Sequence, residues 1–234
     1  MIGWLPPPFN PNIPPAILRR KYASFVRVLL ARPPRRDSRD AGLSIPPLGL
    51  AYLASTLEAQ GRGVELIDAY ALGWSWSRFE REVARRKPDV LGMGTMTPVA
   101  DTVWKAARRL RPHVGTIVVG GPHPTAVAHE IFRDCPQVDH GVSGEGEEVI
   151  GPYLDWLSQG PKRGVPPAGV IARNHPLVSH SPKNPIASIP WPARHLLPQS
   201  SYRYLLATRP GFATMITSRG CPFRCTFCDK SVSG

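Results

Sequence analysis

The sequence lacks any uninterrupted apolar run close to the ~20 residues that a membrane-spanning helix needs. It also lacks the charged start and apolar core that are typical of a secretory signal peptide. These two absences argue against a membrane partner and against secretion, so we expect a cytoplasmic location. The 234 residues suffice for one ample domain, or for one domain and part of another, since domains commonly run ~100 to 200 residues.

Cysteine is scarce as well. The chain has four cysteines, and three of them lie close together as Cys221, Cys225 and Cys228. A disulfide framework would spread its cysteines over a small secreted chain, so this distribution fits a reducing compartment and a metal site better. Cys135 belongs to no ligand pattern and is expected to be a partly buried single thiol.

Acidic residues are also few, with 17 Asp and Glu against 29 Lys and Arg, for a net charge of +12. Clustered basic residues would favour nucleic-acid binding, because they neutralise phosphates. Here they are scattered in short groups, and most are expected on the solvated outer faces of helices. The sequence therefore argues against a nucleic-acid partner, although a basic nucleic-acid-binding protein stays a third and weaker alternative.

Proline marks the divisions of the chain. The 28 prolines concentrate in residues 6–15, 33–47 and 161–198. Residues 1–22 have no periodicity and are predicted to be a disordered leader. Residues 161–204 are predicted to be an interdomain linker, with an extra strand at 169–172.

Residues 23–160 alternate short apolar runs with amphipathic stretches. Continuous apolar strands between amphipathic helices indicate a parallel sheet that is covered on both faces. We therefore predict an α/β, doubly wound, five-stranded, Rossmann-like domain. The expected strands are 24–30, 64–67, 90–94, 116–119 and 138–142, and the expected helices lie near 50–57, 76–83, 99–110, 125–132 and 147–157.

The most distinctive loops follow the predicted strands. In an open parallel sheet, ligands bind beyond the carboxyl ends of the strands, where these loops begin. Adjacent glycines let the backbone approach a large planar ligand, although Gly120-Gly121 could also serve only a tight strand-to-helix turn. The candidate cofactor-binding residues are Thr95, Thr97, Gly120, Gly121, His123, Thr125, Gly144, Glu145 and Gly146.

Two of these candidates have a plainer alternative role. His123 is flanked by prolines, so a hydrogen bond that shapes the loop accounts for it as well as cofactor contact does. Glu145 and Glu147 precede a predicted helix. Capping the N-terminus of that helix is the simpler expectation for them, and contact with cofactor amides is the alternative.

The segment Cys221-Pro-Phe-Arg-Cys225-Thr-Phe-Cys228 has the spacing C-x3-C-x2-C. Three thiolates at this spacing can ligate three irons of a [4Fe-4S] cluster and leave the fourth iron open. Zinc is a weaker alternative, because structural zinc sites normally have four protein ligands and His195 has no paired spacing. Residues 213–217 are predicted to be a strand that leads into this loop, as the first strand of a (β/α) barrel.

Taken in order, these motifs resemble the radical S-adenosylmethionine (radical SAM) enzymes that carry an N-terminal cobalamin-binding domain. The resemblance covers roughly residues 24–230 and includes the strings at 46–54, 88–94, 120–125, 144–147 and 217–221. It implies a [4Fe-4S] cluster on the three clustered cysteines, S-adenosylmethionine at the open iron with Phe227 beside its adenine, and cobalamin on the first domain. Arg219 and Gly220 would shape the entry to the cysteine loop.

The resemblance also implies an activity. The cluster would cleave S-adenosylmethionine to a 5'-deoxyadenosyl radical, for methyl transfer or cyclisation at an unactivated carbon of a small-molecule substrate. The electron donor would be a protein such as flavodoxin or ferredoxin. An Asp-x-His-x-x-Gly motif, which supplies a cobalt ligand in many cobalamin domains, is absent, as is usual for the radical branch.

The same resemblance implies that residues 205–234 are only the start of a radical SAM barrel. We therefore expect this chain to be inactive by itself. The alternative is a non-catalytic cobalamin-binding module with a disordered cysteine tail.

Overall fold

A computed structural model describes residues 26–35, 44–160, 164–180, 186–204, 212–223 and 225–228. The predicted leader, residues 1–22, lies outside the described residues, as do 205–211 and the last six residues.

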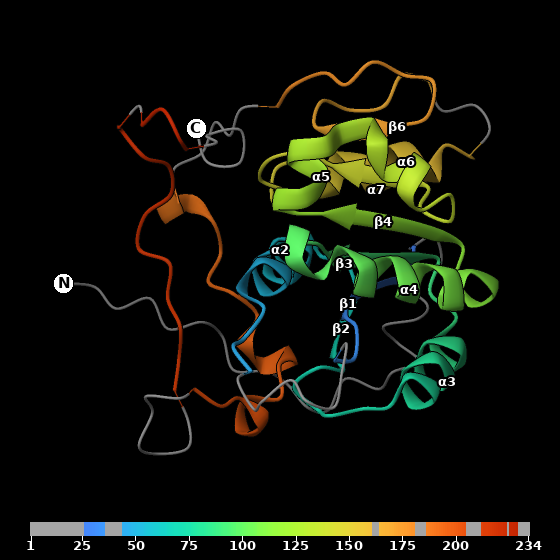
Figure 1. The fold of residues 1–234 in the computed structure, drawn as a ribbon, viewed down its shortest axis with the longest axis vertical. Helices are drawn as coiled ribbons and strands as arrows, with labels where there is room; N and C mark the ends of the chain where they lie inside the picture. The colour runs from blue at the N-terminus through green and yellow to red at the C-terminus, as the bar shows by residue number, and fades with distance from the viewer. Residues whose placement is uncertain are drawn as a thin grey trace.

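Six strands form one sheet in the order β2-β1-β3-β4-β5-β6 (Figure 1). The strands are β1 (Val28–Arg32), β2 (Val64–Asp68), β3 (Val90–Gly94), β4 (Thr116–Gly120), β5 (His140–Val142) and β6 (Val170–Ala172). The first five pair in parallel, which confirms the predicted doubly wound sheet, and β6 pairs antiparallel with β5. The prediction of a five-stranded sheet was one strand short, because the extra strand foreseen within the linker joins the edge of this sheet.

Helices cover both faces of the sheet (Figure 1). They are α2 (Leu48–Ala59), α3 (Trp76–Arg86), α4 (Ala100–Leu110), α5 (Pro122–Val127), α6 (Ile131–Asp134) and α7 (Ile150–Ser158). Alternate residues of β1 point to opposite faces: Leu29 and Ala31 join the core under α3, α4 and α6, whereas Val28 and Leu30 join the core under α2 and α7. None of the described helices is long and apolar enough to cross a membrane.

Two predicted helices differ in detail from those observed. The helix expected from residue 99 begins at Ala100, because Pro98 lies in a 3-10 turn before it and Val99 is exposed. The helix expected over 125–132 is instead α5 and α6, separated at Ala128, whose φ of 47° interrupts the helical backbone.

The segment after β6 packs against the domain. Ala193 donates its backbone N–H to the carbonyl of Ala51 in α2 (2.9 Å), and the Tyr202 hydroxyl donates to buried Asp68 (3.0 Å) at the end of β2. Residues 186–204, predicted to be linker, therefore contribute to the core. Residues 213–217, predicted to be a strand, are not a strand in the structure, because no described segment lies alongside to complete a ladder of hydrogen bonds.

Candidate functional site

The three distinctive loops begin side by side at the carboxyl edge of the sheet. Gly94, the last residue of β3, pairs with Gly120, the last residue of β4, and Gly120 pairs in turn with Val142, the last residue of β5. The strand order reverses between β1 and β3 at this edge, which is the position where doubly wound sheets bind ligands. The register thus brings together the candidate residues that follow β3, β4 and β5.

The loop after β4 closes on the loop after β3. Thr95 donates its N–H to the Gly120 carbonyl (2.7 Å) and accepts from the N–H of His123 (3.1 Å). Gly121 has a φ of 107°, and a Cβ on it would lie 2.9 Å from the Thr95 carbonyl oxygen. The tight turn between strand and helix therefore explains why residue 121 is a glycine, which was the alternative to cofactor contact. Direct contact of Gly120 or Gly121 with a cofactor stays a prediction.

His123 and Thr95 bring buried polar atoms to this edge. The His123 side chain is only 8% exposed; its Nδ1 lies 3.2 Å from the Thr97 hydroxyl, and its ring packs 5.8 Å from that of Trp104. Among the described residues, neither His123 Nε2 nor Thr95 Oγ1 has a hydrogen-bond partner, although both are buried. A buried polar atom without a partner costs ~1 to 3 kcal/mol, so a polar ligand that reached these two atoms would stabilise the fold.

Thr125 joins the second loop to the third. Its hydroxyl donates to the Gly121 carbonyl and accepts from the N–H of Gly144, both at 2.9 Å. Gly144 adopts a left-handed φ of 75°, and Gly146 packs closely on the side chain of Leu53. The candidate threonines, glycines and histidine therefore belong to one hydrogen-bonded edge.

Glu145 and Glu147 bind an arginine instead of capping a helix. Helix α7 begins at Ile150, and no side chain accepts a hydrogen bond at its N-cap. The two carboxylates accept from Arg219, with Nη1 2.8 Å from Glu145 Oε2 and Nη2 2.7 Å from Glu147 Oε1. The preferred expectation of capping was therefore wrong, because one charged guanidinium satisfies both carboxylates at once.

Arg219 is largely buried between the domain and the cysteine loop. Its side chain is 19% exposed and lies 5.2 Å from the centre of the Tyr52 ring. Burial opposes its charge, but the hydrogen bonds of Glu147 and Glu145 outweigh burial and raise the pKa of Arg219. The Arg194 guanidinium also donates to the Thr214 carbonyl, so two arginines attach residues 212–220 to the domain. Nothing in the local sequence around Arg219 indicated this contact, because its partners lie 74 and 72 residues earlier.

The described residues of the cysteine loop, 221–223 and 225–228, are exposed. Cys221, Cys225 and Cys228 form no disulfide, and the N–H of Cys228 donates to the Cys225 carbonyl (3.2 Å). Phe227 is 91% exposed. Within the described ranges, no three His, Cys, Asp or Glu side chains converge as a metal site. Cluster binding by the three thiols and the contact of Phe227 with adenine therefore stay predictions.

Cys135 is a single thiol, as expected, but it is fully and not partly buried. It is fully buried in the core under α4 and α6, and its Sγ lies 3.5 Å from the side-chain oxygen of Gln137. Burial raises the pKa of the Cys135 thiol, which disfavours the thiolate that binds metals.

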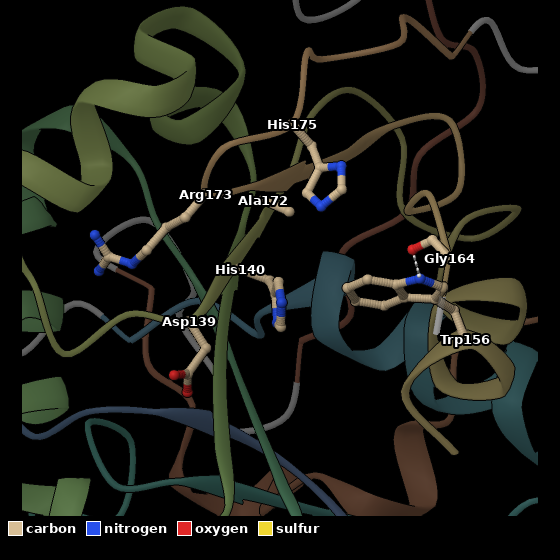
Figure 2. A pocket seen from close by; sticks show the side chains of 7 residues that line it. All are labelled: Asp139, His140, Trp156, Gly164, Ala172, Arg173 and His175. Carbon is tan, nitrogen blue, oxygen red and sulfur yellow. Dashed lines mark hydrogen bonds between the residues drawn. The ribbon is translucent and has the colours of Figure 1, made fainter. Parts of the chain in front are cut away.

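A cavity of about 260 Å³ lies at the opposite edge of the sheet (Figure 2). The rings of His140, His175 and Trp156 border it. His140 is the first residue of β5, and Ala172 is the last residue of antiparallel β6, so this cavity belongs to the amino edge of the parallel strands. It is separate from the three loops that carry the candidate cofactor residues.

Comparison with known proteins gives a family. A sequence model of the B12 binding domain matches residues 38–151. An uncharacterized methyltransferase of Pyrococcus horikoshii is 35% identical over 88% of this chain and 46% of its own length. The anaerobic magnesium-protoporphyrin IX monomethyl ester cyclase of Rubrivivax gelatinosus is 29% identical over 79% of this chain and 35% of its own length. The chain thus spans less than half the length of these curated relatives.

Solved structures share the fold. The cobalamin-dependent S-adenosylmethionine radical enzyme OxsB, solved with aqua-cobalamin and S-adenosylmethionine, matches 92% of this chain and 30% of its own, with a TM-score of 0.72 and 20% identity. The radical S-adenosylmethionine methyltransferase TsrM of Kitasatospora setae, solved with cobalamin and a [4Fe-4S] cluster, matches 89% of this chain and 42% of its own, with a TM-score of 0.64 and 18% identity. The chain therefore carries a B12 binding domain, and its relatives and structural neighbours include cobalamin-dependent radical SAM enzymes.

Proposed function

We propose that the whole protein is a cobalamin-dependent radical SAM enzyme that methylates or cyclises a small-molecule substrate at an unactivated carbon. This chain would contribute its cobalamin-binding domain and its cluster loop. The observation that carries the proposal is the fork of Arg219 on Glu145 and Glu147, which holds the three-cysteine loop beside the candidate cobalamin loops. The names of the relatives, which are methyltransferases and a cyclase, support the reaction class.

The residues present fit these cofactors. Cobalamin carries many amide groups, and the buried, unpartnered His123 Nε2 and Thr95 Oγ1 are polar atoms that such groups would satisfy. Three exposed cysteines on one loop suit a cluster whose fourth iron takes an outside ligand. When bound, these groups supply radical and methyl-transfer chemistry.

The protein's own residues would orient and shield the cofactors. Thr97 and Trp104 fix the ring of His123, while Thr125 and Gly121 hold the loops after β4 and β5 in register. Phe227 would cover the adenine of S-adenosylmethionine. Because the cysteine loop is exposed, a flavodoxin or ferredoxin could approach it to deliver an electron.

Iron content tests the cluster. We expect the full chain, reconstituted without oxygen, to hold about four irons. Replacing Cys221, Cys225 or Cys228 with Ala should remove most of that iron, whereas the control Cys135→Ala should retain it, because this thiol is buried in the core under α4 and α6. Equal iron in all four variants would contradict the assignment.

Cobalamin binding, followed by absorbance, tests the other half of the proposal. His123→Ala should weaken binding up to about tenfold, the equivalent of one hydrogen bond. The control is His129→Ala, because His129 is exposed and bonds to the His175 carbonyl. Bound cobalamin without iron would favour a non-catalytic cobalamin-binding module, and a chain that bound neither would overturn the proposal.

A further inference from the structure

Arg219 connects two segments that the proposed function assigns to different cofactors. It lies two residues before Cys221, whereas its partners Glu145 and Glu147 lie 74 and 72 residues earlier. The link is made by side chains, so the distance between the cysteine loop and the 144–147 loop depends on the fork, with the bond from Arg194 to the Thr214 carbonyl as a second attachment of the segment.

The acceptor side of this link is rigid. The 144–147 loop is held at one end by the bond from the Gly144 N–H to Thr125, and at the other by the N–H groups of Val149 and Ile150, which both donate to the Gly146 carbonyl (3.1 and 2.9 Å). The two carboxylates are therefore presented from a fixed backbone. Binding to a preorganised partner loses less conformational entropy than binding to a mobile one.

The donor side is specific for arginine. The carboxylates of Glu145 and Glu147 are 23% and 9% exposed, so the ion pair is only partly screened by solvent. A planar guanidinium reaches two acceptors at once and stacks on an aromatic ring, here Tyr52. A lysine ammonium is a single point charge and would not reproduce the fork.

We propose that Arg219 is a positioning residue that fixes the cysteine loop against the 144–147 loop, and thereby sets the separation of the iron-sulfur cluster from the cobalamin. The second part of this statement rests on the proposed function, whereas the docking of the two loops does not. One-electron and methyl transfer both depend on the distance between the reacting groups, so a residue that sets this distance acts on the reaction without touching the substrate.

Limited proteolysis tests the docking in the chain without cofactors. Trypsin cuts after Arg219 only when the side chain leaves its carboxylates and enters the protease. In the double variant Glu145→Gln, Glu147→Gln we expect cleavage of the 219–220 bond to become about tenfold faster, because cleavage follows the population of the open form. The control is Glu148→Gln, since Glu148 directly follows the 144–147 loop but faces His180 (3.4 Å). Equal rates in the double variant and the unmodified chain would overturn the docking.

Electron paramagnetic resonance tests the separation of the cluster from the cobalamin in the chain that has both cofactors bound. Cobalamin in its cobalt(II) state and the reduced cluster are both paramagnetic, so the electron-spin relaxation of the cobalt reports its separation from the cluster. Arg219→Ala should retain iron and cobalamin but weaken and broaden this relaxation enhancement, and Arg219→Lys should restore it only in part. Relaxation in Arg219→Ala that matched the unmodified chain would overturn the positioning role.

A second arginine supplies a matched control. Arg86 on α3 also forks between two carboxylates, those of Glu65 and Glu82 at 2.9 and 2.6 Å, and is 18% exposed. Arg86→Ala should leave both the cleavage at 219–220 and the relaxation unchanged. If the unmodified chain bound neither cofactor, the proposed function would fail, while the cleavage rates would still decide whether Arg219 docks the loop.

Discussion

At the scale of single residues, Gly121 makes the approach of the loops after β3 and β4 possible. An alanine there would be held at a φ of 107° with its Cβ 2.9 Å from the Thr95 carbonyl oxygen. We expect Gly121→Ala to lower the free energy of unfolding by about 1 to 3 kcal/mol, the usual cost of one strained residue. Urea unfolding monitored by circular dichroism measures this change.

The matched control is Gly49 in α2. An added Cβ there meets nothing within 4 Å, and the backbone is helical. Gly49→Ala should therefore raise the free energy of unfolding, by up to about 1 kcal/mol. If both substitutions had the same effect, the close approach of Gly121 to Thr95 would not be what constrains the turn.

Asp68 is a second residue whose environment has a measurable consequence. Its carboxylate is fully buried at the end of β2, where it accepts from Tyr202 and from the N–H of Ala71, with Arg32 3.6 Å away. Burial raises the pKa of Asp68 above its ordinary 3.8, although Arg32 and the hydrogen bonds pull it down. The folded chain thus holds this proton to a higher pH than the unfolded chain does.

The sign of the pH dependence follows from that difference. The contribution of Asp68 to stability is fully present below pH 3.8 and is lost as the pH rises through the folded-state pKa. We expect the unmodified chain to lose stability relative to Asp68→Asn as the pH is raised, in urea unfolding at a series of pH values. Arginines lower the pKa values of Glu80, Glu82 and Asp89. The pH-dependent contributions of these residues to stability are the same in both chains, so they cancel in this comparison. A difference that did not change with pH would contradict the expectation.

At the scale of elements, β6 decides how far the first domain extends. Ile171 in its centre is fully buried in the core with α4 and α6, and its side chain packs over Gly141 of β5 beside Ile131. We expect Ile171→Ala to lower the free energy of unfolding by about 2 to 5 kcal/mol, as for other buried large-to-small changes. Chemical denaturation of the full chain measures this loss.

Val178 is the control for Ile171, because it lies six residues after the end of β6 and its side chain is half exposed. Val178→Ala should change stability by no more than about 0.5 kcal/mol. A similarly small effect of Ile171→Ala would mean that this part of the chain behaves as a linker and not as an edge strand.

At the scale of the whole molecule, the 29 Lys and Arg residues are less available to an outside anion than their number suggests. Many arginines are engaged in ion pairs within the described ranges: Arg27, Arg62, Arg85, Arg86, Arg109, Arg111, Arg133 and Arg219. We therefore expect only weak binding of duplex DNA at about 0.15 M salt. Fluorescence anisotropy at several salt concentrations checks this, and tight binding that fell steeply with added salt would contradict it.

The candidate site could be foreseen in its parts but not in its connections. The loops after β3, β4 and β5 were identifiable because parallel strands place their carboxyl ends at one edge. The partner of Glu145 and Glu147 could not be identified in this way. A carboxylate that precedes a helix in the sequence is most simply interpreted as a helix cap. Arg219 lies more than 70 residues away, and nothing in the spacing couples it to that loop.

The parallel sheet and its helices could be predicted from the sequence, because periodic burial and short apolar strands are properties of neighbouring residues. The resemblance to cobalamin-dependent radical SAM enzymes could be recognised as well, through motifs that depend on residue type and spacing. The fold was needed to reveal that β6 joins the sheet, that Tyr202 closes over Asp68, and that Arg219 ties the cysteine loop to the domain. Each of these contacts joins segments far apart in the chain, and such contacts depend on how the packed elements meet in space and not on local pattern.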